Sequence, residues 1–395
     1  MSAEPSTTES PGPTGSSAHA GSTDATKAAR LPFWRRPRVL AVVVALVLAV
    51  TAGSVAIGRT IDREAVEPVP SVSVTPIPGG VRPGLQRART LLGTPPSGSP
   101  WFSGAWVGGG VATAQRYKAF GTWRGKPLDA ATTYPASGSW SEISESNWHI
   151  STFNGFPGVL VYGLPMLPTN DPGDFDSIVR GEHDDVYRQV AKDLLANQRG
   201  RAIVRIGWEA NGDWFPWNTR ASQAAAYRNA FRHIVGVLRS VAPDLVIDFD
   251  LACGTKLRGQ DSRTDALTDL YPGDDVVDLV GCDTYDWYNT ITTDDATWAR
   301  TQHPSSSVGI GDVAAFARAH GKGLSVPEWG LADPSQQGRG DNPLFIERMR
   351  GFFEANQDIL VLESYFSEPE TSIRNSIYDP VQNPASAAAY RRLWG

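Results

Sequence analysis

The stretch that organises the rest of the chain reads RIGWEANGDWFPW, residues 205–217. The apolar residues 202–206 lead into it and predict a buried strand, after which Glu209 stands in a turn of Gly, Asn, Asp and aromatic residues. A carboxyl group transfers protons, and aromatic rings stack on the apolar faces of sugars. The stretch therefore predicts a sugar-processing site at the C-terminal end of a barrel strand. The alternative interpretation is a buried strand followed by a plain surface turn.

A second carboxylate follows the same pattern. Residues 322–330, KGLSVPEWG, predict a short apolar strand that ends at Glu328, followed by an aromatic residue and a glycine. Glu209 is expected to end the fourth strand and Glu328 the seventh, so that both meet at the barrel mouth. Two carboxyl groups about 5–5.5 Å apart predict a retaining double displacement by one nucleophile and one acid/base.

The alternation of side chains along strands adds supporting residues. If Glu209 faces the barrel interior, Arg205 does too, and a buried arginine needs an anionic neighbour such as an ionised nucleophile. Tyr285 ends the segment 271–285, which contains the predicted sixth strand, and is placed to donate a hydrogen bond to that nucleophile. Asp286 and Trp287 follow it and are expected to offer a sugar-hydroxyl acceptor and a stacking face.

Short apolar runs alternate with helical patterns from Trp101 to the C-terminus. Eight strands in about 295 residues predict an α/β fold, a (β/α)₈ TIM barrel over residues 101–395, with an open doubly wound sheet as the competing architecture. The expected strands are Phe102–Val107, Ala130–Tyr134, Gly158–Tyr162, Ala202–Trp208, Val246–Ala252, Val276–Cys282, Gly323–Pro327 and Ile359–Tyr365, and the expected helices include Asp184–Asn197, Ser222–Val241, Asp312–His320, Pro343–Ala355 and Ala385–Trp394.

Three further segments are predicted before the barrel. Residues 1–38 have a composition typical of a disordered cytoplasmic segment, and residues 39–58 form an uncharged run long enough for one transmembrane helix. Residues 59–100, rich in Pro and Ser, are expected to be an extracytoplasmic linker. The arginines before the apolar run place the N-terminus in the cytoplasm and the barrel outside, at the cell membrane. The alternative is secretion after cleavage of a signal peptide.

Composition argues against several other classes of protein. Lys+Arg 36 against Asp+Glu 42 gives a net charge of -6, which offers no electrostatic support for nucleic-acid binding. The two cysteines and six histidines show no metal-ligand spacing, and neither a metal nor another cofactor is expected. Cys253 and Cys282 are expected on the helix-facing side of neighbouring strands. A disulfide is permitted outside the cytoplasm, but two buried thiols are the favoured interpretation because parallel-strand geometry is demanding.

Residues 205–217, 271–285 and 327–330 together resemble glycoside hydrolase family 26, best known for β-mannanases, a family of retaining (β/α)₈-barrel glycosidases. The resemblance implies that Glu209 is the acid/base and Glu328 the nucleophile. Where the family usually has His and Met around the acid/base, this chain has Trp208 and Ala210, which puts mannan in doubt as the substrate. The residues expected to support catalysis or contact substrate are Arg205, Trp208, Asn211, Trp214, Trp217, Asp283, Tyr285, Trp287 and Trp329.

These features predict a membrane-anchored, retaining glycoside hydrolase that cuts within a β-linked or cell-wall polysaccharide. Its expected partners are that polysaccharide and, through residues 39–58, the lipid bilayer. Two alternatives stay open: a transglycosylase that remodels an endogenous polysaccharide, and a carbohydrate-binding barrel without catalysis.

Overall fold

The computed structural model describes residues 84–170, 172–370 and 373–395. The predicted disordered segment, the predicted transmembrane helix 39–58 and the linker up to residue 83 lie outside the described residues. Within the described ranges, every helix is too short or too polar to cross a bilayer.

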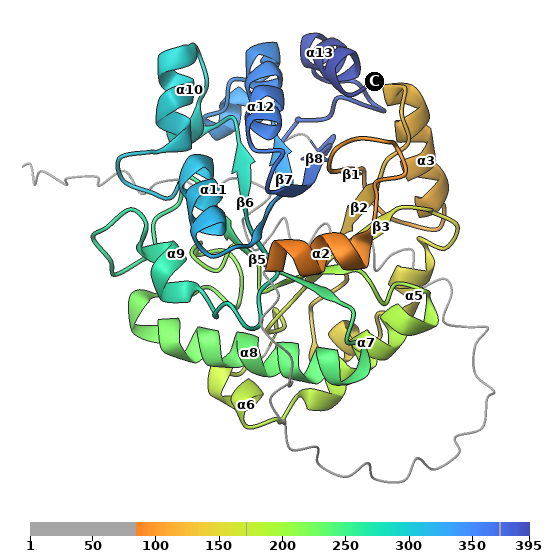
Figure 1. The fold of residues 1–395 in the computed structure, drawn as a ribbon, viewed down its shortest axis with the longest axis vertical. Coiled ribbons are helices and arrows are strands. Elements are labelled where there is room, and N and C mark those ends of the chain that lie inside the picture. The colour runs from red at the N-terminus through yellow and green to blue at the C-terminus, as the bar shows by residue number, and fades with distance from the viewer. Residues whose placement is uncertain (1–83, 171, 371–372) are drawn as a thin grey trace, which may run out of the picture. The chain divides into compact units, whose positions relative to one another are not determined.

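Eight parallel strands close into a barrel in the order of the sequence, β1 to β8, each paired with its neighbours and β1 with β8. This confirms the predicted TIM barrel and excludes the open sheet. Figure 1 shows the helices as a ring around the strands. The strands are β1 (Phe102–Trp106), β2 (Ala130–Thr133), β3 (Val159–Leu164), β4 (Ile203–Ile206), β5 (Val246–Ala252), β6 (Leu279–Tyr285), β7 (Gly323–Gly330) and β8 (Leu360–Phe366).

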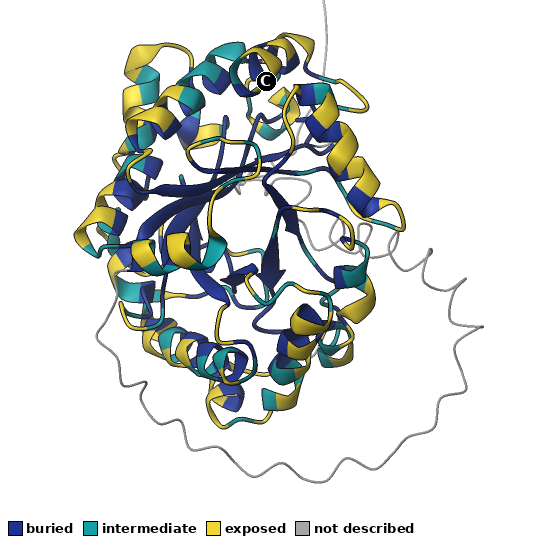
Figure 2. Cartoon of the chain, turned by 45° about the vertical axis from the view of Figure 1, so that its right-hand side comes forward, coloured by how far each residue is buried: buried dark blue, intermediate teal, exposed yellow. Residues whose placement is uncertain are grey.

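The helices lie mainly between successive strands and turn apolar faces toward them. The largest, α8, has an apolar face that includes Phe231, Ile234 and Leu238, all fully buried. In Figure 2 the strands are buried, while the helices expose only their outer faces. The helices are α2 (Gly84–Leu92), α3 (Thr113–Arg124), α4 (Trp140–Ser144), α5 (Asn147–Ser151), α6 (Phe175–Val179), α7 (Asp184–Ala196), α8 (Ala224–Val241), α9 (Asp265–Leu270), α10 (Asp295–Gln302), α11 (Ile310–Ala319), α12 (Pro343–Ala355) and α13 (Pro384–Trp394), with short 3₁₀ turns at Ala221–Gln223, Tyr288–Thr290 and Pro334–Gln336.

The barrel interior changes from apolar to charged along its axis. Side chains near the strand N-termini, among them Phe102, Val161 and Ile203, form a separate apolar cluster. Further along, β5 turns Asp248 and Asp250 inward and packs its intervening apolar residues against the outer core. The interior is thus closed by hydrocarbon at one end and lined by ionisable groups at the other.

Seven of the eight strands differ from their predicted bounds by one to three residues at an end, and the differences in β4 and β7 affect the two glutamates. β4 ends at Ile206, and Gly207 and Glu209 adopt left-handed φ angles of 51° and 53°. A turn, rather than strand alternation, therefore delivers Glu209. In contrast, β7 runs on to Gly330, with a register shift between Val326 and Trp329, so Glu328 lies within the strand.

Helix α2 corrects the predicted linker 59–100, because residues 84–92 are helical and belong to the barrel. Ala88 is fully buried, and three leucines of α2 pack against the apolar cluster at the strand N-termini. Arg87 donates hydrogen bonds to Asp278, which precedes β6, and to the carbonyl of Leu245, which precedes β5. In Figure 1 α2 lies across the middle of the ring of helices. It covers the N-terminal face of the barrel, opposite the strand ends that carry Glu209.

Candidate active site

Glu328 accepts hydrogen bonds from three side chains on three other segments. The Tyr285 hydroxyl donates to Oε2 over 2.6 Å, and the Tyr134 hydroxyl donates to Oε1 over 2.5 Å. The Arg205 guanidinium also donates to Oε1, over 3.1 Å. Burial works to raise the pKa of Glu328, but the charge of Arg205 and the two hydroxyls outweigh it and hold that pKa below its ordinary value. The carboxylate is therefore kept ionised.

Glu209 has a different environment. Its side chain is buried, and Oε2 accepts a hydrogen bond from the Trp214 indole N–H over 2.7 Å. Its backbone N–H donates to the carbonyl of Asp250 on β5 over 3.2 Å, which holds the left-handed turn against the neighbouring strand. Trp214 thus orients the carboxyl group in the structure.

Arg205 is fully buried and forms ion pairs with three carboxylates. One amino group contacts Asp250 Oδ2 at 2.9 Å and Asp283 Oδ2 at 2.6 Å, and the other contacts Glu328. Arg205 therefore faces inward as predicted. Asp283 is paired with Arg205 through Oδ2 and is 1% exposed, so it supports the site rather than offering a sugar contact. Asp250 on β5 is a further member of the cluster, and its pairing with Arg205 was not predicted from the sequence.

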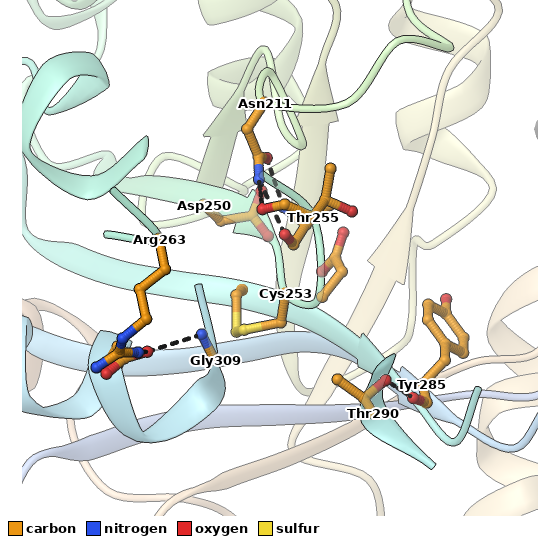
Figure 3. Close-up of a disulfide and its surroundings, with 12 residues drawn as sticks. Asn211, Asp250, Cys253, Thr255, Arg263, Tyr285, Thr290 and Gly309 are labelled. Carbon is orange, nitrogen blue, oxygen red and sulfur yellow. Dashed lines mark hydrogen bonds and ion pairs between the residues drawn. A yellow bond between two sulfur atoms is a disulfide. The ribbon is translucent and has the colours of Figure 1, made fainter. Parts of the chain in front are cut away.

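Asn211 was expected to contact substrate, but its side-chain amide is hydrogen-bonded to backbone groups inside the protein. Its Oδ1 accepts from the Ala252 N–H, and its Nδ2 donates to the carbonyls of Ala252 and Thr255. Figure 3 shows this amide meeting the segment that follows β5. Asn211 thus ties the turn that carries Glu209 to the end of β5 and is not a substrate contact.

The two cysteines form a disulfide at the same strand end, which corrects the favoured interpretation of two thiols (Figure 3). Cys253 directly follows β5, and Cys282 lies on β6 as the partner of Leu251. Both side chains point to the helix side of the sheet, and their Cα atoms are 5.5 Å apart, within the range that a disulfide spans. The bond fixes the segment to which Asn211 is attached.

Two of the predicted sugar-stacking tryptophans belong to the core. Trp217 is 1% exposed and donates its indole N–H to the carbonyl of Trp208. Trp329 is fully buried, with its ring 4.9 Å from that of Tyr365, and donates to Glu363 outside the barrel. Because Glu328 points inward, its neighbour on the strand points to the helices. Neither ring is available to a sugar.

Other aromatic rings line the mouth. Trp208 packs between Tyr134 and Phe215, with the Arg205 guanidinium 5.8 Å from its ring centre. Trp287, half-buried, lies 5.9 Å from Tyr285 in an edge-to-face arrangement. Two rings that the sequence analysis missed are Trp106 at the end of β1 and Phe366 at the end of β8, stacked 4.4 Å apart. Trp106 is the last residue but one of the predicted first strand, and Phe366 directly follows the predicted eighth strand, so their position near strand ends is the signal that could have identified them.

Comparison with known proteins places this geometry in a family context. The model described as glycosyl hydrolase family 26 matches residues 169–303. Endoglucanase H of Acetivibrio thermocellus is 32% identical over 136 residues, which cover 32% of this chain and 14% of that protein. Mannan endo-1,4-beta-mannosidase of Bifidobacterium adolescentis is 34% identical over 102 residues, or 23% of this chain and 10% of that protein. The chain therefore matches only a small part of either relative.

Solved structures share the fold. The endo-beta-1,4-mannanase double mutant of Cellulomonas fimi superposes with a TM-score of 0.55 at 16% identity, over 79% of this chain and 74% of that one. The catalytic domain of the family 26 endo-beta-1,4-mannanase of Bacillus sp. JAMB-750 gives a TM-score of 0.54 at 14% identity, over 80% and 90%. The resemblance to glycosyl hydrolase family 26 is therefore confirmed, with the sequence match covering residues 169–303 and the barrel extending beyond it.

Proposed function

We propose that this protein is a retaining glycoside hydrolase in which Glu328 is the nucleophile and Glu209 the acid/base. The observation that carries the proposal is the set of donors on Glu328. Three hydrogen bonds, one of them from a buried guanidinium, keep a buried carboxylate ionised, as a nucleophile requires. A carbohydrate-binding barrel without catalysis has no need of such a costly arrangement.

In this mechanism Glu328 attacks the anomeric carbon while Glu209 gives its proton to the departing glycosidic oxygen. The glycosidic bond to the leaving sugar breaks, and at the same time an ester bond forms between Glu328 and the remaining sugar. Glu209, now ionised, takes a proton from water, and the resulting hydroxide attacks the same carbon and releases Glu328. The Trp214 indole, 2.7 Å from Glu209, orients the carboxyl group in both steps.

The substrate class proposed is a β-linked polysaccharide cut within its chain. The match to an endoglucanase and to a mannan endo-1,4-beta-mannosidase supports a β-1,4-linked backbone without choosing between glucose and mannose. Trp208, which replaces the polar residue that mannanases of the family usually carry there, favours a backbone other than mannan.

We further propose that residues 39–58 anchor the chain in the cell membrane with the barrel outside, with secretion after signal cleavage as the alternative. An anchored enzyme acts on polymer near its own cell. Transglycosylation would suit that setting equally, and incubation with an added acceptor oligosaccharide separates the two reactions: products longer than the substrate identify a transglycosylase.

The proposal is tested by replacing each glutamate and using aryl β-cellobiosides and β-mannobiosides with an activated leaving group. Glu209→Ala should lose about 10²–10⁴-fold on polymer but still form the glycosyl ester from an activated substrate, which needs no proton. Azide should then restore turnover with retained configuration. Glu328→Ala should be inactive on every substrate unless azide opens a route with inverted configuration.

Glu182→Ala, which removes an exposed glutamate, is the control and should retain full activity. If Glu209→Ala is as inactive on the activated glycoside as on polymer, or if the rescued products have the opposite configurations, the assignment of the two roles is wrong.

A further inference from the structure

The cluster around Arg205 holds more negative charge than one guanidinium neutralises. Asp250, Asp283 and Glu328 all contact Arg205, and the side chains of the two aspartates are fully buried. If all three were ionised, the barrel interior would keep two uncompensated negative charges away from water, which is strongly unfavourable. At least one of these groups must therefore retain a proton.

Glu328 is not that group, because its oxygens already receive hydrogen bonds from two hydroxyls and from Arg205. Asp250 and Asp283 differ from it. Both accept a hydrogen bond at Oδ2 from the same amino group of Arg205, over 2.9 Å and 2.6 Å, so the two carboxyl groups lie side by side, where two ionised carboxylates repel each other. Asp250 Oδ1 and Asp283 Oδ1 are also buried without a donor from any described residue. A proton on either group supplies the missing donor.

We propose that Asp250 and Asp283 share one proton and act together as a single negative charge. With one anion fewer beside it, the positive charge of Arg205 still stabilises the ionised form of Glu328. The inference rests on the proposed function and adds a positioning pair to it. Because Asp283 interacts electrostatically with both Glu209 and Glu328, the charge of the pair acts on both catalytic groups. Loss of the shared proton would add a second negative charge beside the nucleophile.

The surroundings of the pair agree with one retained proton. Burial raises the pKa of Asp283 well above its ordinary value, and the charges of Asp250, Glu328 and Glu209 raise it further, against Arg205. Burial likewise raises the pKa of Asp250. Other ionisable groups near the pair are Asp248, which is on the same strand as Asp250 and is hydrogen-bonded to the Ser325 hydroxyl, and the hydroxyls of Tyr134, Tyr227 and Tyr285.

Asparagine is the variant that tests the proposal, because its amide donates where the shared proton would lie. In Asp283→Asn or Asp250→Asn the remaining aspartate is the single negative charge, so the net charge equals that of the proposed pair. The double variant removes this charge and leaves Arg205 with Glu328 alone. Asp248→Asn is a matched control, since Asp248 also faces inward from β5 but contacts Ser325 instead of Arg205.

The measurement is the acid limb of kcat/KM against pH on an activated aryl β-glycoside, which reports the ionisation of the nucleophile in the free enzyme. Each single Asn variant and the control should keep the wild-type midpoint, to within about 0.3 pH unit. The double variant should lower it by about one pH unit or more, because a negative charge near Glu328 is lost. If each single variant also lowers the midpoint by about one unit, both aspartates are ionised in the native protein and the proposal is wrong. If the double variant leaves the midpoint unchanged, both are neutral and the proposal is wrong as well.

Infrared difference spectra of the folded proteins at neutral pH provide a readout that does not need activity. The wild type should show the carbonyl stretch of one protonated carboxyl group that is absent from the double variant. A difference spectrum without that band overturns the proposal. If the wild type cleaves no β-glycoside, the proposed function fails, and the infrared measurement still decides whether the pair holds a proton.

Discussion

Two tyrosines from strands that are not neighbours hold the same carboxylate. Tyr285 ends β6 and Tyr134 follows β2, and each donates its hydroxyl to a different oxygen of Glu328. Tyr134 also accepts a hydrogen bond from Arg205 over 2.5 Å, so the arginine and one tyrosine act on Oε1 together. The ionisation of Glu328 thus depends on donors from several parts of the barrel, each of which can be removed separately.

Tyr134→Phe and Tyr285→Phe should each raise the pKa of Glu328, because a hydrogen bond to the charged form is lost. The acid limb of kcat/KM should therefore move to higher pH by about one unit in either variant. Tyr365→Phe removes a buried hydroxyl that donates to the carbonyl of Asn375 instead, and it should leave the limb unchanged. A limb that stays in place in both test variants would show that the two hydroxyls do not set the charge of Glu328.

Trp208→His tests whether the departure from the family pattern determines the substrate. Relative to glucan, the activity on mannan should rise by at least about tenfold, because the imidazole restores a polar contact. Since Trp208 is 6% exposed and packs on Phe215 and Trp217, the variant should also lose about 2–4 kcal/mol of stability. Trp208→Phe, which keeps an apolar ring, should leave the preference as in the wild type. An unchanged preference in the His variant would contradict the prediction.

The sequence predicted which residues lie at the candidate site better than it predicted what each of them does there. Arg205, Glu328 and Tyr285 could be predicted because alternation along a strand indicates which side chains face inward. Glu209 could be predicted because it closely follows the end of an apolar strand. Trp217 and Asn211 could not be assigned correctly, since the turn after β4 folds back on itself and buries both. A local pattern predicts position along a strand, but the partners of a turn depend on packing.

At the scale of elements, the turn after β4 and the extension of β7 bring the two glutamates to the mouth in different ways. Glu209 depends on a left-handed backbone, which costs a non-glycine residue about 1 kcal/mol and needs support from its neighbours. Asn211, bound to the end of β5, and the disulfide that fixes that end provide the support. Glu328 needs none of this because it lies within a strand.

The element that the sequence analysis did not predict is α2. Its surroundings are rich in Pro and Gly, and its nine residues carry only a short apolar face, so that composition favours a linker. This face finds a packing partner only when the barrel closes, because the strand N-termini then form the apolar cluster against which it packs. The eight strands, in contrast, were predictable because most of them lie in short, largely apolar segments that alternate with helical patterns along the chain.

Removal of α2 should destabilise the barrel without altering its chemistry. Arg87→Ala should cost about 1–3 kcal/mol, since Asp278 loses one of its two arginine partners inside the protein. Gln86→Ala, exposed on the same helix, should change stability by less than about 0.5 kcal/mol. Denaturant unfolding gives both values. A chain that begins at residue 94 should unfold at lower denaturant than one that begins at residue 80, and equal midpoints would show that α2 is only a linker.

For the molecule as a whole, the two ends of the barrel have different tasks. The N-terminal end is closed by α2 and by apolar side chains, while the C-terminal half of the interior is filled by carboxyl groups whose burial opposes folding. The chain enters the barrel on the face opposite the candidate site. The candidate catalytic groups thus lie in the half of the barrel where buried carboxyl groups lower the free energy of unfolding. The pH dependence of unfolding should reveal how much stability these groups cost.

Asp248 is the residue at which the effect of a buried carboxyl group on the free energy of unfolding can be measured most clearly. Burial, with a further contribution from the charge of Asp250, raises the pKa of Asp248 to about 7, so the folded protein binds a proton that the unfolded chain releases near pH 4. Between about pH 4 and about pH 7 this group therefore makes the free energy of unfolding fall as the pH rises. Asp248→Asn should remove that slope, and its stability relative to wild type should increase across the window by up to about 4 kcal/mol.

Ser325→Ala gives the opposite change, because the hydroxyl of Ser325 donates to Asp248 over 2.7 Å and favours the charged form. Its loss should raise the pKa of Asp248 further and extend the declining part of the curve to higher pH. Denaturant unfolding at intervals from pH 4 to pH 9 provides the three curves. If wild type and Asp248→Asn run parallel over that range, Asp248 is ionised in the folded barrel, and the carboxyl groups beneath the site are stabilised by contacts other than a retained proton.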